Sequence, residues 1–252
     1  MKKTLVLPVF AVMISVLGIS AQNAMAETFT VSDLLSCQSP SVGGVWNNAT
    51  STCKITTLVI GPADTLVIAS NVVFNIGTVT SSGTITNDGT INIATGGVMT
   101  TSGIVTNNGI IASNGGTITN SGPFNNFGVI TSSGTITNGP TGVIQSDGKI
   151  TSSGVITSSG TILVKETGML INNGGTLTNT LNLVNHGTVM TSGTFTNSGP
   201  VMNSGVITNQ GLLTNSNTIA NDGSIFNLCG GKIVNSGTIA THTVQNICVA
   251  LT

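Results

Sequence analysis

The chain has 252 residues, of which 5% are charged and 3% are aromatic, and it contains neither arginine nor tyrosine. Residues 27–252 carry four lysines against seven acidic residues, so no basic stripe is available for a nucleic-acid partner. Little charge and low complexity are also typical of disordered chains, but those are poor in β-branched residues. This chain is rich in Val, Ile and Thr, and its composition therefore favours an ordered, repetitive fold.

Residues 1–26 are predicted to be a signal peptide. Two lysines stand at its start, a short apolar run covers residues 5–19, and Ala24-Met25-Ala26 supplies a small-x-small cleavage pattern. The apolar run is short for a membrane span. We therefore expect a secreted protein that has no membrane span once the signal is cleaved.

Residues 27–76 predict an N-terminal cap together with the first strands. Two apolar strand runs, at 57–60 and 65–68, flank the turn Gly61-Pro62-Ala63-Asp64. Trp46, the only tryptophan, is either a core residue of this cap or an exposed binding aromatic. A cap is expected in a repeat protein because an unpaired strand edge recruits other chains.

Residues 77–241 contain a six-residue repeat that reads Gly, Thr or Val, aliphatic, Thr, Asn or Ser, and a small polar residue. Gly83-Thr84-Ile85-Thr86-Asn87-Asp88 is an example, and the third position is apolar in every unit. Because strand side chains alternate, the Thr residues on either side of it point the opposite way. The glycine indicates a corner that needs positive φ or close backbone approach. Asn at the fifth position indicates a hydrogen-bonded ladder at the corners, since Asn tolerates the left-handed region.

Grouping the units in threes gives coils of 18 to 21 residues with coherent columns of residues. On the first face the fourth position is Thr in eight of nine coils, and the corner that follows is lined mainly by Ser. Short strands of this kind become stable only by stacking on equivalent strands of the next coil. The prediction is an all-β, three-sided parallel β-helix or solenoid of about nine coils. The repeat leaves its handedness undecided.

Four cysteines remain after signal cleavage, two before the repeat and two near its end. An even number in an exported chain indicates disulfides, and we expect the local pairs Cys37–Cys53 and Cys229–Cys248. The second pair would hold a C-terminal capping strand over residues 242–252.

The pattern resembles hexapeptide-type β-helices and, more closely, the Gly-Thr-Ile-Thr-Asn-Ser repeats of secreted microbial β-helix surface proteins. The resemblance covers residues 55–241 and implies an extracellular, cell-surface role. It differs from left-handed acyltransferase helices, because glycine lies two residues before the aliphatic position and no histidine loop interrupts the coils.

Two candidate sites are visible in the columns. The threonines of the first face form a flat array of hydroxyls and methyls that resembles the ice-binding faces of solenoid antifreeze proteins, although Thr also suits exposed strand positions in general. The array comprises Thr78, Thr80, Thr100, Thr117, Thr119, Thr135, Thr137, Thr157, Thr176, Thr178, Thr194, Thr196 and Thr214. Asp147, Glu166 and His186 fall in successive coils at another corner, either as a divalent-metal site or as a solvated corner.

The sequence contains no paired carboxylates and no nucleophile–base arrangement, so we expect neither an enzyme nor a cofactor. The leading prediction is a structural or adhesive element of the cell surface, with the protein itself or a surface polymer as partner. The alternative is a binding module that holds ice or a carbohydrate on the Thr-rich face.

Overall fold

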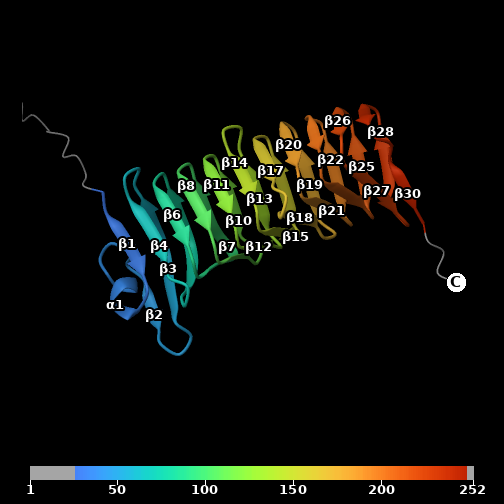
Figure 1. The fold of residues 1–252 in the computed structure, drawn as a ribbon. Helices are drawn as coiled ribbons and strands as arrows, with labels where there is room; N and C mark the ends of the chain where they lie inside the picture. The colour runs from blue at the N-terminus through green and yellow to red at the C-terminus, as the bar shows by residue number, and fades with distance from the viewer. Residues whose placement is uncertain (1–25, 249–252) are drawn as a thin grey trace, which may run out of the picture.

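The computed structural model describes residues 26–248 and forms a rod of stacked coils, with β1 and β30 at opposite ends (Figure 1). The predicted signal peptide, apart from Ala26, lies outside the described residues. So do residues 249–252, the last part of the predicted capping strand.

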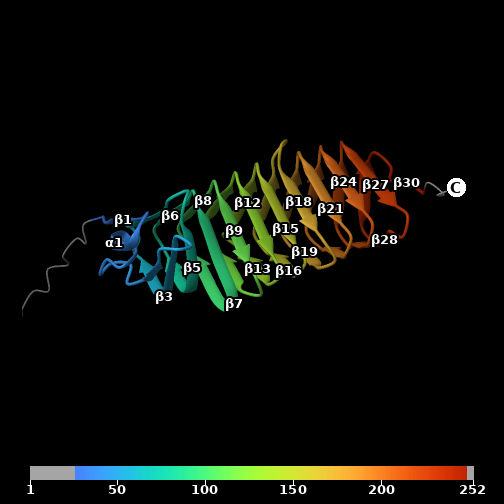
Figure 2. The same cartoon turned by 90° about the horizontal axis from the view of Figure 1, so that it is seen from below.

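Each coil contributes one short strand to each of three faces, which confirms the predicted three-sided parallel solenoid. Three early strands are long, because each follows the third face, turns the corner and continues along the first face of the next coil (Figure 2). They are β3 (Thr52–Ile60), β5 (Val73–Ser81) and β7 (Thr90–Thr101).

The remaining strands separate by face. After the second halves of the long strands, the first face holds β10 (Thr117–Asn120), β13 (Thr135–Asn138), β16 (Val155–Ser158), β19 (Thr176–Asn179), β22 (Thr194–Asn197), β25 (Leu212–Asn215) and β28 (Lys232–Asn235). The second face is β1 (Thr28–Val31), β4 (Thr65–Ile68), β6 (Thr84–Asn87), β8 (Ile104–Asn107), β11 (Pro123–Asn126), β14 (Val143–Ser146), β17 (Thr161–Val164), β20 (Asn182–Asn185), β23 (Val201–Asn203), β26 (Thr218–Asn221) and β29 (Thr238–Thr241). After the first halves of the long strands, the third face holds β9 (Ile110–Ser113), β12 (Val129–Ser132), β15 (Lys149–Ser152), β18 (Met169–Asn172), β21 (Thr188–Thr191), β24 (Val206–Asn209), β27 (Ser224–Leu228) and β30 (Gln245–Ile247).

The described solenoid has about ten coils, one more than the repeat predicted. The additional coil consists of residues 57–76, and Thr57 pairs in parallel with Thr78 of the first hexad. This coil lacks the regular hexad glycines, but its apolar residues alternate in the same phase. Alternation, rather than the full repeat, is therefore sufficient for a turn of the solenoid.

Close approach of the backbone explains the corner glycines. A Cβ on Gly134 would strike the carbonyl oxygen of Gly116, and one on Gly154 would strike that of Gly134. Neither residue has a positive φ; the described glycines with positive φ are Gly43, Gly96, Gly115, Gly174 and Gly230. Close packing against the previous coil, rather than a positive φ, is therefore the general reason for glycine at the corners.

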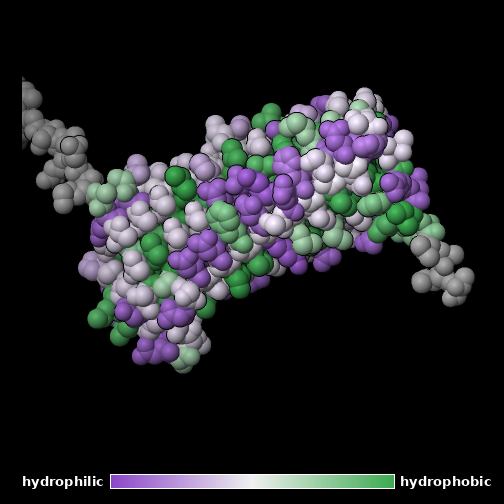
Figure 3. Space-filling model, in the orientation of Figure 1, coloured by the Kyte–Doolittle hydropathy of each residue, from purple (hydrophilic) through white to green (hydrophobic). Residues whose placement is uncertain are grey.

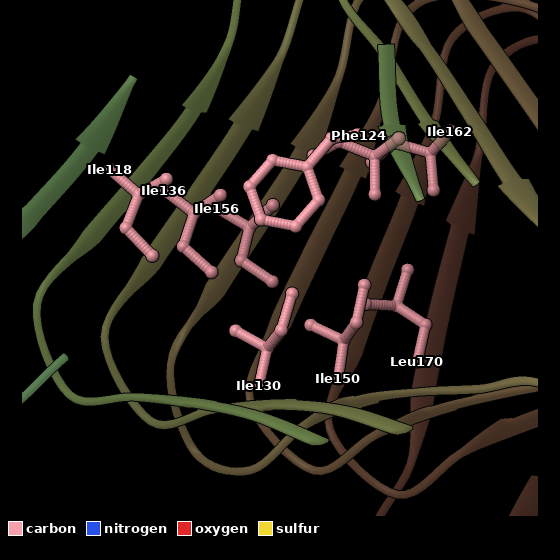
Figure 4. A pocket seen from close by; sticks show the side chains of 9 residues that line it. Ile118, Phe124, Ile130, Ile136, Ile150, Ile156, Ile162 and Leu170 are labelled. Carbon is pink, nitrogen blue, oxygen red and sulfur yellow. The ribbon is translucent and has the colours of Figure 1, made fainter. Parts of the chain in front are cut away.

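The core is a stack of aliphatic side chains from the third position of each hexad. Ile118, Phe124 and Ile130 represent one coil, and each is at most 3% exposed. A gap of about 20 Å³ lies between this coil and the next two, lined only by eight aliphatic side chains and Phe124 (Figure 4). A water molecule needs polar partners, so the gap is a dry packing defect and offers no ligand site.

Asparagine side chains at the fifth position lie inside the solenoid, which corrects the prediction of a left-handed Asn at each corner. Asn87, Asn107 and Asn185 are fully buried at the ends of strands, and the described non-glycine residues with positive φ are Ser51 and Thr241. The ladder itself is present: Nδ2 of Asn87 donates to Oδ1 of Asn107 at 2.7 Å, and Asn107 donates likewise to Asn126. These bonds satisfy buried amides that would otherwise be costly.

A small cap closes the N-terminal end. Asp33 caps the N-terminus of helix α1 (Leu34–Cys37): its carboxylate accepts a hydrogen bond from the Ser36 amide, and this bond lowers the pKa of Asp33. Strand β2 (Val45–Asn47) pairs antiparallel with β3. Trp46 is half-buried and packs against the core, as the cap-core reading predicted.

Both predicted disulfides are present. Cys37–Cys53 joins α1 to β3 and is fully buried. Cys229–Cys248 joins the residues that follow β27 and β30, whose last residues Leu228 and Ile247 are paired in register. One bridge therefore lies in the cap and the other ties together the last two coils of the third face.

Candidate functional site

The predicted threonine array forms one continuous surface on the first face. At the fourth position, the parallel register aligns Thr80, Thr100, Thr119, Thr137, Thr157, Thr178, Thr196 and Thr214 without a break. At the second position it aligns Thr78, Thr117, Thr135, Thr176 and Thr194 with interruptions at Val98, Val155, Leu212 and Lys232.

The side chains of this array point outward. Thr78 and Thr80 are exposed, and the others are half-buried between neighbouring coils. Within residues 26–248, none of their hydroxyls forms a hydrogen bond with another protein group, whereas the inward-facing Thr101 donates to the Gly103 carbonyl. The array therefore presents regularly spaced, uncommitted hydroxyls to solvent or to a ligand.

The serine-lined corner after the first face has a structural role that sequence reasoning missed. The amide of Ser216 donates to the carbonyl of Asn197, one coil earlier, and its hydroxyl donates to the same oxygen at 3.1 Å. Ser159 repeats this arrangement with Asn138. The serine column thus reinforces the connection between coils.

The predicted metal site is not supported. Asp147, Glu166 and His186 line one shallow surface depression together with Lys165 and Thr167, but residues 26–248 contain no group of three potential ligands able to hold an ion. Lys165 occupies the corner position between Asp147 and His186. The ring nitrogen Nδ1 of His186 contacts the hydroxyl of Ser204 at 2.6 Å. The lysine ammonium in this column disfavours a divalent ion there by charge repulsion, and the solvated-corner interpretation fits.

Sequence reasoning also missed a groove at the corner between the third and first faces of the early coils. Its volume is about 590 Å³, and it is lined by Lys54, Ile55, Thr56, Asn75, Ile76, Gly77, Asn92, Ala94, Thr95, Gly96 and Gly97. The available signal was the spacing of eight residues from Gly89 to Gly97, where six is usual. The extra residues lengthen one corner relative to its neighbours.

The outer surface shows no large segregated patch on the side in view. Figure 3 shows hydrophilic and hydrophobic residues interspersed along the rod. The exposed apolar side chains include Ile104, Phe127 and Met202. Among residues 26–248, no helix has the length and apolar character needed to cross a membrane.

Two segments, residues 41–139 and 200–247, match the family model described as haemagglutinin repeat. Together they make up more than half of the chain. The chain belongs to the haemagglutinin repeat family. Comparison with curated proteins gave no match, and comparison with solved structures gave none either.

The segment between the two haemagglutinin repeat matches continues the same solenoid. Within it, Ile144 pairs with Ile162 and Ile162 with Leu183 in the regular parallel register. Some of its corners are longer than the usual two residues, as at residues 165–168 between β17 and β18. The family membership, the solenoid and the disulfides together suit an extracellular or cell-surface protein with an adhesin-like structural role.

Proposed function

We propose that this protein is a non-catalytic, adhesin-like rod that is secreted and displayed at the cell surface. The observation that carries the proposal is the unbroken parallel pairing of about ten coils, which makes a stiff element with long, nearly uncharged outer faces. Two disulfides favour an oxidising environment outside the cell. The predicted signal peptide supplies the export route.

Agglutination tests this function directly. Beads coated with the folded, secreted chain are expected to agglutinate red blood cells or to adhere to cultured cells. Beads coated with reduced, alkylated and heat-denatured chain are the matched control, since they carry the same composition without the solenoid. Equal adhesion by folded and denatured coatings, or no adhesion by either, would contradict the proposal.

Surface display and self-association have a separate test. Brief protease treatment of intact cells of the source organism is expected to release or degrade the protein while cytoplasmic markers survive. Electron microscopy of the purified protein then shows whether the rods associate laterally or end to end, as a structural surface element requires. Protection of the protein in intact cells would count against surface display.

The threonine array favours one second candidate function, the ordering of water or of a carbohydrate on the first face. Its support is the alignment of eight successive threonines with uncommitted hydroxyls. Thr137→Lys is expected to abolish inhibition of ice recrystallisation or binding to a polysaccharide, whereas Thr106→Lys, on the second face, is the control. Absence of both activities in the unmodified protein would remove this candidate.

A further inference from the structure

The groove at the early corners arises from unequal corner lengths in successive coils. Single residues, Thr56 and Gly77, join the third face to the first in two neighbouring turns. In the next turn the register shifts, and Ala94, Thr95, Gly96 and Gly97 occupy the same corner. The short corners therefore form a floor, and the four-residue corner forms a wall beside it.

A chain of outward-facing amides ends in this groove. Nδ2 of Asn114 donates to Oδ1 of Asn92, and Nδ2 of Asn92 donates to Oδ1 of Asn75, both at 3.1 Å. Nδ2 of Asn75, the last in the chain, donates to no other group in residues 26–248. Because each amide polarises the next, the terminal donor is strengthened toward an acceptor outside the protein.

Lys54 stands directly beside this donor. It pairs with Asn75 in the parallel register, so their outward side chains are neighbours, about 4.8 Å apart along the sheet. Lys54 is exposed and forms no ion pair with any residue of the described range 26–248. No carboxylate lines the groove. An ammonium and an amide donor side by side match the two oxygens of a carboxylate.

We propose that this groove binds a saccharide that bears a carboxylate, such as a uronic acid. The carboxylate lies between Nζ of Lys54 and Nδ2 of Asn75, and the sugar hydroxyls contact Thr56, Thr95 and the backbone of the four-residue corner. The open groove exposes carbon surface beside these polar groups, and a sugar ring has both C–H groups and hydroxyls with which to contact it. The inference rests on the proposed adhesive function, since it names the class of molecule that the rod holds.

A peptide fits this groove less well. Extended peptides bind solenoids by adding a strand to a free sheet edge, and β5 at the groove is paired on both sides, with β3 and with β7. The apolar residues of the floor, Ile55 and Ile76, are buried and offer no anchor pocket. The polar groups exposed in the groove are amides, hydroxyls and one ammonium, beside the exposed methyl of Ala94.

Calorimetric titration of the full secreted chain with trigalacturonate tests the inference. Binding is expected in the millimolar to micromolar range and to weaken at high salt, because the ion pair is exposed. Lys54→Gln is expected to weaken binding at least fivefold. Asn75→Asp, which replaces the donor with a repelling carboxylate in the same volume, is expected to weaken it more than tenfold.

The matched control is Lys149→Gln, which removes another exposed lysine on the third face, five coils beyond Lys54, and is expected to leave binding unchanged. Neutral maltotriose and a tri-glutamate peptide are the ligand controls. Equal binding of either control, equal loss in Lys149→Gln, or no binding of trigalacturonate would overturn the inference. Adhesion of coated beads without trigalacturonate binding overturns this site alone, whereas trigalacturonate binding without adhesion overturns the proposed function alone.

Discussion

The side-chain amide of Asn179 donates to Oδ1 of Asn197, one coil later, at 2.8 Å, while Oδ1 of Asn179 receives no hydrogen bond. The reason is Ser158, which stacks before Asn179 in the same column and is too short to reach it. Ser158 instead accepts from Asn138 and donates to the Gly160 carbonyl. Between Asn120 and Asn235, the ladder of the first face is therefore broken at one rung.

Ser158→Asn is expected to join the two halves of this ladder. The new Nδ2 would donate to the orphaned Oδ1 of Asn179, as Asn197 does to Asn215. Satisfying one buried acceptor is expected to raise the free energy of unfolding by about 1 kcal/mol, measured by urea denaturation. Ser158→Ala is the control and is expected to lower it by a similar amount. A destabilised Ser158→Asn protein would contradict the ladder's role.

Gly134→Ala is expected to lower the free energy of unfolding by at least about 2 kcal/mol, because the added Cβ strikes the Gly116 carbonyl and the coils must separate. Gly139→Ala is the matched control, since its nearest neighbour is the Ser121 hydroxyl at 3.2 Å. Thermal unfolding of both variants is the measurement. Equal melting temperatures would show that corner glycines are not required for close packing.

Phe124→Ala is expected to lower the free energy of unfolding by about 3–5 kcal/mol, since it removes a buried aromatic next to an existing core gap. Phe127→Ala, only three residues away, removes a side chain that is 53% exposed at a corner. Its effect is expected to stay within about 0.5 kcal/mol. Urea denaturation followed by circular dichroism distinguishes the two, and similar losses would contradict the assigned core.

Cys248→Ser is expected to loosen the last coil more than the centre of the rod. The bridge to Cys229 closes a loop of 19 residues in sequence separation, for which chain entropy predicts about 3 kcal/mol. Hydrogen exchange is expected to accelerate in β27 and β30 and to remain slow in β13 and β16. Uniform acceleration along the chain would instead indicate a single cooperative unit.

Much of the architecture was predictable because it depends on local periodicity. The alternation of side chains along a strand predicted that the third-position aliphatics lie inside. The column of threonines, which is coherent only when hexads are grouped in threes, predicted three strands per coil. The two disulfides followed from the position of the cysteines on either side of the repeat. The extra coil at residues 57–76 needed the structure, because its sequence obeys the alternation without the full hexad.

The sequence by itself determined a three-sided, nearly uncharged solenoid with threonines aligned on one face. Only the tertiary structure decided that Asn87 and its equivalents lie inside, that Lys165 stands between Asp147 and His186, and that Lys54 and Asn75 meet at a groove. The physical reason is that the alternation of inward and outward side chains is a local property of each strand. Contacts between coils depend instead on the lengths of the corners that separate the strands. At the third-to-first corner of the early coils, the corner length varies from one residue to four. The combined corner lengths of each coil decide which residues of successive coils become neighbours.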